Sequence, residues 1–238
     1  MKYIINADDY GLNENVTFAI IESIKKNYIT NSTMIVNSCY FETAVELAKK
    51  HELTNKIGLH INLTKGEPLT ENIKKCKRFV DTDGRFNIQH RNRILTLSKL
   101  EKKALSEEVD AQMKRFIGAG DFLMHFDSHH HIHNVYPIYK IIRYEAKKNG
   151  FKSCRIARNM GKIPFLKRIY KRFLNRQISK DFMVTNYFGD VRDVEYLSKT
   201  KIKNSVIEIM CHPCFEGNEV RDSLDRGLIR DIKKELDF

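Results

Sequence analysis

The chain has 238 residues, of which 42% are hydrophobic and only four are prolines, a composition that excludes a disordered or collagen-like protein. It contains no apolar run of about 18 residues, which excludes a membrane-spanning helix. The formal net charge is +12, so polyanions should be attracted at low salt, although charge alone does not make a nucleic-acid-binding protein.

Short apolar stretches alternate with helical patterns along the chain, and no Gly-, Ser- or Pro-rich linker interrupts them. We therefore expect one domain, residues 1–238. In chain order, we predict a strand at 3–7, a helix at 13–27, a strand at 32–37, a helix at 42–51, a strand at 56–63, a turn at 81–86, a helix at 98–118 with Ser98 as N-cap, a strand at 122–127, a helix at 137–148, an amphipathic helix at 163–177, a strand at 205–210 and a last helix at 222–238. This alternation indicates parallel strands with helical crossovers, in an open α/β sheet or a barrel.

The densest basic stretch, GKIPFLKRIYKRFLNRQISK, has seven Lys or Arg residues and no acidic residue. Its apolar residues follow helical spacing, with the charges mostly opposite. Three interpretations compete: a helix that covers the protein's own core, a helix that lies on an anionic membrane, and a nucleic-acid-binding patch. We expect the first, because an amphipathic helix most often packs on its own domain.

Carboxylates and imidazoles fall at or near the carboxyl ends of four predicted strands. In parallel α/β folds these ends open on one face, where loops build the active site. Taken singly, His60 could be a core histidine and the Asp pair a helix cap. Taken together, they favour a site, because several unsupported polar burials would be costly. The residues are Asp8, Asp9, His60, Asp127, His129 and His212.

The segment DSHHHIH is the densest group of histidines. Successive residues at a strand end point in different directions, so we expect one metal ligand here, with the other histidines supporting it or facing substrate. His125 lies within the strand and is expected to be structural. One carboxylate with two imidazoles leaves positions open for water and substrate, as a hydrolytic metal site requires.

At these residues the sequence resembles the YdjC-like carbohydrate deacetylases, a family that includes the chitooligosaccharide deacetylases. The matching segments are NADDYGLN, NSTMIVN, GLHINLTKGEPL, DSHHHIHNVYP and IEIMCHP, from Asn6 to Pro213. The resemblance implies an irregular (β/α) barrel of the polysaccharide-deacetylase type, a divalent ion, and hydrolytic removal of an N-acetyl group from an amino sugar. It places the metal ligands on Asp9, His60 and His129 and the general base on Asp8.

Several positions depart from the family pattern. Cys214 stands where the family usually has glycine, Ala157 and Asn159 where it tends to have proline and glutamate, and Asn186 and Tyr187 where an acid and a histidine are more usual. These departures concern loops expected to contact substrate, and they leave the metal and base positions unchanged.

The expected mechanism has the ion polarise the acetamide carbonyl and activate a water whose proton Asp8 accepts. His212, or a histidine of the cluster, then protonates the leaving amine. We also expect Asp127, His131, His133 and Arg155 to contact substrate. Two alternatives stay open, a metal-dependent phosphoesterase and a non-catalytic metal- or polyanion-binding protein.

The expected partners are an acetylated amino sugar or oligosaccharide and one divalent ion. Magnesium or zinc is favoured for the ion, and manganese, cobalt and nickel also fit such ligands. We expect no nucleic-acid partner and do not favour membrane association, while a homodimer is one option for the oligomeric state. The N-terminus has too short an apolar run for a secretion signal, and the five cysteines are scattered. We therefore expect a cytoplasmic protein.

Overall fold

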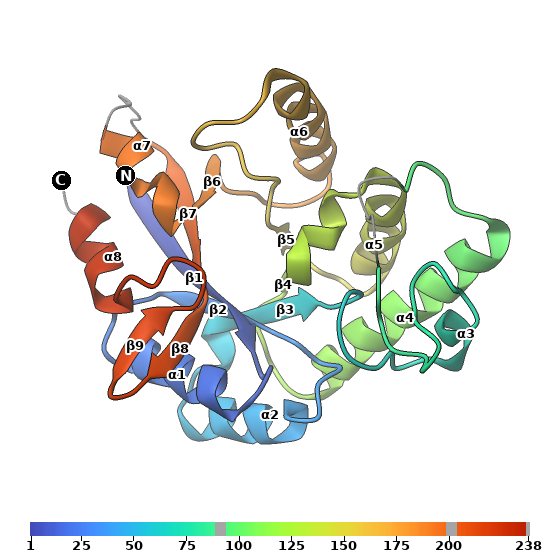
Figure 1. The fold of residues 1–238 in the computed structure, drawn as a ribbon, viewed down its shortest axis with the longest axis horizontal. Coiled ribbons are helices and arrows are strands. Elements are labelled where there is room, and N and C mark those ends of the chain that lie inside the picture. The colour runs from blue at the N-terminus through green and yellow to red at the C-terminus, as the bar shows by residue number, and fades with distance from the viewer. Residues whose placement is uncertain (89–93, 199–203, 237–238) are drawn as a thin grey trace.

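The fold is built on a curled sheet of seven parallel strands with helices around it (Figure 1). The computed structural model describes residues 1–88, 94–198 and 204–236. The strand order is β5-β4-β3-β2-β1-β7-β6, and β8 and β9 form a separate antiparallel pair. No helix in the described parts of the chain is both long and apolar enough to cross a membrane.

The strands and helices alternate for most of the chain. The strands are β1 (Lys2–Tyr10), β2 (Asn31–Met34), β3 (Ile57–Ile61), β4 (His125–Ser128), β5 (Ser153–Cys154), β6 (Tyr187–Asp190), β7 (Val206–Cys211), β8 (Pro213–Glu216) and β9 (Glu219–Asp222). The α-helices are α1 (Glu14–Lys25), α2 (Phe41–Lys50), α3 (Glu71–Lys74), α4 (Lys99–Gly118), α5 (Tyr136–Lys148), α6 (Phe165–Ile178), α7 (Val194–Ser198) and α8 (Ile229–Leu236). Short 3-10 turns lie at η1 (Thr54–Lys56), η3 (His129–Asn134) and η4 (Val191–Asp193).

The curl of the sheet brings its two edge strands, β5 and β6, toward each other without pairing them in the described residues. An isolated parallel bridge joins Ser153 of β5 to Met183, which precedes β6. The backbone N–H of Cys154 donates to the carbonyl of Met183 at 3.1 Å. The architecture is therefore barrel-like, as expected, with irregular backbone where a closed barrel would continue its strand pairing.

Local sequence explains where the main helices begin. The Asn13 side chain accepts a hydrogen bond from the Val16 N–H ahead of α1. Ser98 and Glu101 form a capping box at the start of α4, which confirms the predicted N-cap. The side chains satisfy N–H groups that have no partner within the helix, and so fix the helix starts.

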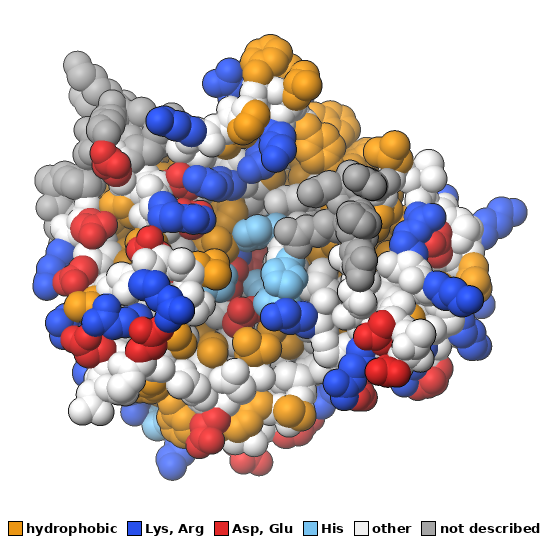
Figure 2. Space-filling view, in the orientation of Figure 1, with side chains coloured by type: hydrophobic (Ala, Val, Ile, Leu, Met, Phe, Trp, Pro, Cys, Tyr) orange, Lys and Arg blue, Asp and Glu red, His pale blue; other side chains and the backbone are white. Residues whose placement is uncertain are grey.

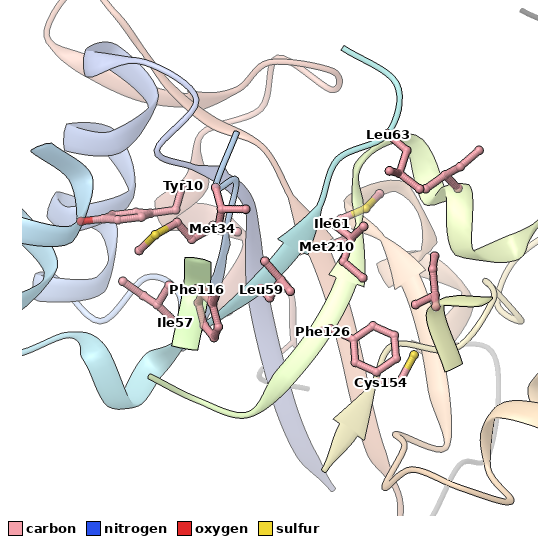
Figure 3. Packing of buried hydrophobic residues seen from close by; sticks show 14 of the residues in the cluster. Tyr10, Met34, Ile57, Leu59, Ile61, Leu63, Phe116, Phe126, Cys154 and Met210 are labelled. Carbon is pink, nitrogen blue, oxygen red and sulfur yellow. The ribbon is translucent and has the colours of Figure 1, made fainter. Parts of the chain in front are cut away.

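The buried hydrophobic side chains form one core cluster between the sheet and the surrounding helices. All five residues of β3 are buried, as expected for a central parallel strand covered on both faces. Figure 3 shows Tyr10 of β1, Met34 of β2, Leu59 of β3 and Phe126 of β4 in this cluster, with Phe116 of α4 nearby. The core fixes the sheet whose strand ends carry the functional residues.

The predicted last helix was wrong at its start, because α8 begins only at Ile229. Asp222 instead ends β9, where its carboxylate accepts the N–H groups of Leu224 and Asp225. Such a local side-chain-to-backbone turn competes with a helix start. The sequence interpretation also missed β5, β6 and the β8–β9 hairpin, whose strands have only two to four residues each.

The expectation that the basic helix packs on the core is wrong for most of its apolar side chains. The helix itself exists as α6, but only Leu174 and Ile178 are buried among its residues. Phe165 and Leu166 are 65% and 78% exposed. Amphipathic spacing predicted the helix correctly, and the surrounding fold leaves its apolar stripe uncovered.

Candidate metal and acid–base site

A backbone irregularity near the end of β1 brings two successive carboxylates, Asp8 and Asp9, to the same site. Along a regular strand neighbouring side chains point to opposite faces. The pairing of β1 with β2 shifts register between Ala7 and Tyr10, and Asp9 has a φ of 72°. This left-handed conformation is uncommon outside glycine and is frequent at functional sites. Here it lets Asp8 and Asp9 serve the same site with different partners.

The pairing of β3 with β4 places His60 directly beside Asp127. The Asp127 carboxylate lies 2.6 Å from His60 Nδ1, and Thr33 Oγ1 donates to the same carboxylate at 3.1 Å. Both partners orient the imidazole so that its Nε2 faces Asp9. A carboxylate behind a histidine is a common arrangement for ligating histidines, because it fixes the tautomer and the ring orientation.

Asp9, His60 and His129 form a group able to hold a metal ion, with ligand atoms within 4.8 Å of one another. Asp9 Oδ1 lies 3.2 Å from His60 Nε2 and 2.8 Å from His129 Nδ1. Ligand atoms about 3 Å apart match the edge of a coordination sphere whose bonds are about 2.1 Å long. Within the described parts of the chain, the buried His129 Nε2 has no hydrogen-bond partner. The donor set and its spacing therefore fit a divalent ion.

The electrostatics of this group also fit a cation. Burial alone would raise the pKa of Asp9, but its hydrogen bonds to His129 and His60 hold that pKa well below the usual value. Burial alone would lower the pKa of His60, but the charge of Asp127 and its hydrogen bond raise it to about 10. The site thus stabilises positive charge at the imidazole, which a divalent ion can supply in place of a proton.

A second group, Asp8, His60 and Asp127, also brings its ligand atoms within 4.8 Å. All three residues are buried, and Arg155 already contacts both of these carboxylates. A hydrolytic site needs an open position for water and substrate. Asp9 is partly exposed, so the group that contains it is the better candidate.

Arg155 is the electrostatic centre beneath the site and is fully buried, at 0% exposure. Its guanidinium binds both oxygens of Asp8 at 2.7 and 2.8 Å, Asp127 at 2.6 Å and Glu208 at 2.6 Å. Burial would lower its pKa, but the three carboxylates raise it well above the usual value. The arginine stays charged and fixes the direction in which Asp8 points.

Two of the carboxylates around Arg155 have pKa values that are shifted in opposite directions. Burial raises the pKa of Glu208 despite the nearby guanidinium. Burial also acts to raise the pKa of Asp127, but Arg155 and His60 hold it below the usual value.

Sequence reasoning missed Glu208, whose signal was a single acid within the apolar strand VIEIMC. It also missed Thr33, a buried hydroxyl on β2.

His212 follows β7 and lies across from Asp8. The register pairs Ala7 with Cys211 on neighbouring strands, so the next residue of each strand faces the other. His212 Nε2 is 4.0 Å from Asp8 Oδ2, and the His212 side chain is 19% exposed. Its backbone N–H donates to Asp222 at 2.7 Å, which ties it to the β8–β9 hairpin. The structure therefore brings His212 to the predicted site.

The other histidines of the cluster lie in the sharp turn after His129 and contact different neighbours. His130 and His131 both have left-handed backbone, with φ of 51° and 52°, which turns the chain sharply after His129. His133 is fully buried, and its Nδ1 lies 2.5 Å from Ser128 Oγ. His131 packs edge-on against Phe188, and burial with the charge of Arg155 lowers its pKa to about 3.

These positions change part of the expected substrate contact. Asp127, His133 and Arg155 are each 0% exposed, so in this structure they support other protein groups and present no surface to a substrate. His131 is partly exposed and keeps a surface for such contact. His125 lies on β4 with Nδ1 3.0 Å from Ser153 Oγ, consistent with the structural role expected for it.

Two residues that depart from the family pattern connect loops to the sheet. Asn159 donates to the carbonyl of Asn186 at 3.0 Å and accepts the Phe188 N–H. The Asn186 side chain accepts the N–H of Val206 at the start of β7. These amides therefore brace the loop segments beside β6. Figure 2 shows histidines and acidic side chains at the bottom of a hollow in this face of the molecule.

Known proteins resemble the chain over nearly its whole length. Carbohydrate deacetylases of Listeria welshimeri and Halalkalibacterium halodurans are 31% and 30% identical, and each match covers 93% of this chain and 85% or 88% of the relative. A solved structure provisionally described as a cellobiose-phosphate cleavage protein, from Enterococcus faecalis, matches with a TM-score of 0.74 and 25% identity. That match covers 99% of this chain and 89% of the other. The family model for YdjC-like proteins matches residues 2–238, and the chain therefore belongs to the YdjC-like protein family.

Proposed function

We propose that this protein is a metal-dependent carbohydrate N-deacetylase that removes an acetyl group from an amino sugar by hydrolysis. The observation that carries the proposal is the pairing of the Asp9–His60–His129 group, which reaches the surface at Asp9, with the separately anchored carboxylate of Asp8. The relatives named carbohydrate deacetylase support the same activity. The polysaccharide-deacetylase type of barrel is part of this proposal, since the curled sheet is compatible with it.

Asp9, His60 and His129 would hold the divalent ion. Bound there, the ion would polarise the acetamide carbonyl and lower the pKa of a water molecule. The mixed oxygen and nitrogen donors accept several first-row ions as well as magnesium. The chain itself provides the geometry, because Asp127 and Thr33 orient the His60 ring from behind.

Asp8 is the proposed proton acceptor. Arg155 holds both of its oxygens, and Asn6 donates to Oδ1 at 3.0 Å, so the carboxylate cannot rotate away. Oδ1 already accepts two hydrogen bonds, whereas Oδ2 accepts one from Arg155 among the described residues and keeps a second lone pair with which to accept the proton of the attacking water. A base whose direction is fixed in advance loses no freedom when the reaction begins.

His212 is the proposed proton donor to the leaving amine. An amine leaves readily only if its nitrogen is protonated as the C–N bond breaks. His212 is partly exposed and lies beside Asp8, whereas His133 is fully buried against Ser128. Of the histidines considered from the sequence, His212 is therefore the better placed for this role.

A phosphoesterase is the main rival. It would need a cation free to hold the phosphate. Arg155, the cation at this site, is fully buried and occupied by three carboxylates. The site geometry therefore favours an amide substrate over a phosphoester.

The test is an acetate-release assay on N-acetylated amino sugars and chitooligosaccharides of several lengths. The purified protein is loaded in turn with magnesium, zinc, manganese, cobalt and nickel, and both acetate and free amine are measured. Equal amounts of the two products from wild type, lost in Asp8→Asn and retained in the exposed control Asp121→Asn, would support the proposal. Phosphate release from a phosphoester without acetate release would overturn it.

A further inference from the structure

Helix α6 carries an apolar face that the described residues leave largely exposed. Phe165, Leu166 and Ile169 lie within one helical turn and are 65%, 78% and 51% exposed, and Phe173 continues the stripe at 43%. The helix is attached to the domain through a different side, which buries Leu174 and Ile178. A contiguous exposed apolar stripe on a soluble fold marks an interaction surface.

The flank of the same helix is strongly positive. No acidic residue lies in residues 161–180, which hold seven Lys and Arg residues. Ion pairs with carboxylates are absent for Arg168, Lys171 and Arg172 across the residues that the structure describes. These three side chains line a pocket of ≈ 340 Å³ together with Arg158, Asn159 and Ile163.

The positive charge in this pocket is only partly compensated. Burial lowers the pKa of Lys171, and the nearby charges of Arg158 and Lys167 lower it further. Asp193 and Asp190 pair with Arg158, Asp190 also pairs with Arg192, and the charge of Asp193 partly offsets the lowering of the Lys171 pKa. An anion that entered the pocket would relieve this repulsion.

The apolar stripe and the cations belong to one face of the molecule. Figure 2 shows hydrophobic side chains gathered at the upper edge, where Figure 1 places α6, and Lys and Arg side chains between them and the histidines. A helix with exposed apolar residues beside a basic flank is the pattern that lies in the interface of an anionic bilayer. A second copy of this chain would bring another basic flank against the first, which charge repulsion opposes.

We propose that α6 docks this protein on an anionic membrane surface. Phe165, Leu166 and Ile169 enter the boundary between headgroups and acyl chains, and the pocket formed by Arg168, Lys171 and Arg172 receives lipid phosphate. No covalent step is involved.

Docking by α6 also places the candidate site at the membrane. Tyr170 Oη donates to the carbonyl of Asn134 at 2.7 Å and accepts the Tyr136 N–H at 3.1 Å. Asn134 ends the η3 segment that begins with His129. On the basis of the function proposed above, the substrate class is an N-acetylated amino sugar carried on a lipid.

The first experiment measures sedimentation of the full chain with vesicles of phosphatidylcholine alone or of equimolar phosphatidylcholine and phosphatidylglycerol. Wild type is expected to bind the anionic vesicles at physiological salt. Phe165→Ser/Leu166→Ser/Ile169→Ser should lower the partition coefficient about tenfold or more, because it removes the inserted apolar surface. Leu100→Ser, at a 57% exposed position on α4, is the matched control and should bind as wild type does.

The charge variant is Arg168→Gln/Arg172→Gln. It should lower binding to anionic vesicles about tenfold or more while leaving the weaker binding to neutral vesicles unchanged. Lys49→Gln/Lys50→Gln removes the same charge from α2, where both side chains are exposed, and should have little effect. Circular dichroism confirms that each variant is folded.

Two results would overturn the proposal. One is wild-type sedimentation no greater than in the absence of lipid. The other is a wild-type dimer, seen by size-exclusion chromatography, that the apolar triple variant turns into a monomer, since a second copy would then be the occupant of this face.

The second experiment separates docking from the deacetylase function. Acetate release is compared for N-acetylglucosamine on a lipid anchor in anionic vesicles and for soluble chitooligosaccharides. The apolar triple variant should lose at least about tenfold on the vesicle substrate and retain wild-type turnover on the soluble one. Equal turnover of wild type and this variant on vesicles would refute the substrate class, whereas vesicle binding without acetate release from either substrate would count against the deacetylase function alone.

Discussion

Replacing Arg155 with methionine should strongly destabilise the protein. Methionine keeps an unbranched apolar stem but is shorter and uncharged, so it leaves the carboxylates of Asp8, Asp127 and Glu208 in the interior without their cation. All four side chains are at most 3% exposed, and the contacts that are lost measure 2.6–2.8 Å. Breaking a buried ion pair by removing one partner costs about 3–5 kcal/mol, because the remaining charge is left uncompensated.

A loss of about 3–5 kcal/mol is a large share of the total stability of a domain, which is about 5–15 kcal/mol. For a chain of this size it corresponds to a fall in melting temperature of about 6–20 °C. The assay is urea unfolding of Arg155→Met and wild type, both in metal-free buffer, followed by circular dichroism. Arg192→Met is the matched control, since Arg192 is 62% exposed and, among the described residues, pairs only with Asp190. It should cost at most about 1 kcal/mol.

A second substitution tests the physical reason. Glu208→Gln in the Arg155→Met background removes one of the stranded charges, so it should recover about 1–3 kcal/mol of the loss. In the wild-type background the same change should destabilise, because Arg155 then loses a partner. If Arg155→Met unfolds within about 1 kcal/mol of wild type, as the control does, the three carboxylates do not depend on this cation and the account of the buried network is refuted.

Three further predictions concern single positions. His60→Ala and His129→Ala should each weaken divalent-metal binding at least about 100-fold in isothermal titration calorimetry; affinity equal to wild type in both would remove them as ligands. Thr33→Val keeps the volume but loses the hydroxyl donor to the carboxylate behind His60, and should cost about 1–3 kcal/mol in urea unfolding; an unchanged midpoint would contradict this. The hydrogen bond from Arg143 lowers the pKa of Asp181 to about 2. The stabilisation of the folded state by ionised Asp181 is therefore complete above the ordinary pKa range of a carboxyl group, and it is lost as the pH falls toward about 2. Asp181→Asn should therefore cost about 1 kcal/mol at pH 7, a difference that shrinks between about pH 4 and pH 2; a difference independent of pH would show that charge is not the cause.

The sequence predicted the long elements well because their patterns are strong. β1, β3 and β7 are apolar runs, and the start of α4 has a capping box. β5 has two residues and is defined only by its neighbours in the sheet, so no periodicity could have revealed it. Helical spacing revealed α6, but it could not tell which side of the helix the domain would cover.

The candidate site was predictable to the extent that it depends on strand ends. Asp8 and His60 lie near the carboxyl ends of β1 and β3, and His212 directly follows β7; the topology alone brings such positions together. The role of Arg155 was not predictable in this way. Whether an arginine after a strand faces substrate or turns beneath the site depends on which carboxylates surround it, and these come from three other strands.

The measurement that tests the central claim most directly compares the two adjacent carboxylates. Metal content and acetate release are determined for Asp8→Asn and Asp9→Asn across a titration of divalent metal. If Asp9 is a ligand and Asp8 the base, Asp8→Asn keeps its metal and loses turnover by about 100-fold or more at every metal concentration. Asp9→Asn should lose metal affinity, and added metal should restore part of its activity, because an amide oxygen remains but the negative charge does not. Rescue of Asp8→Asn alone by added metal would reverse the two roles, and full activity in both variants would contradict the site.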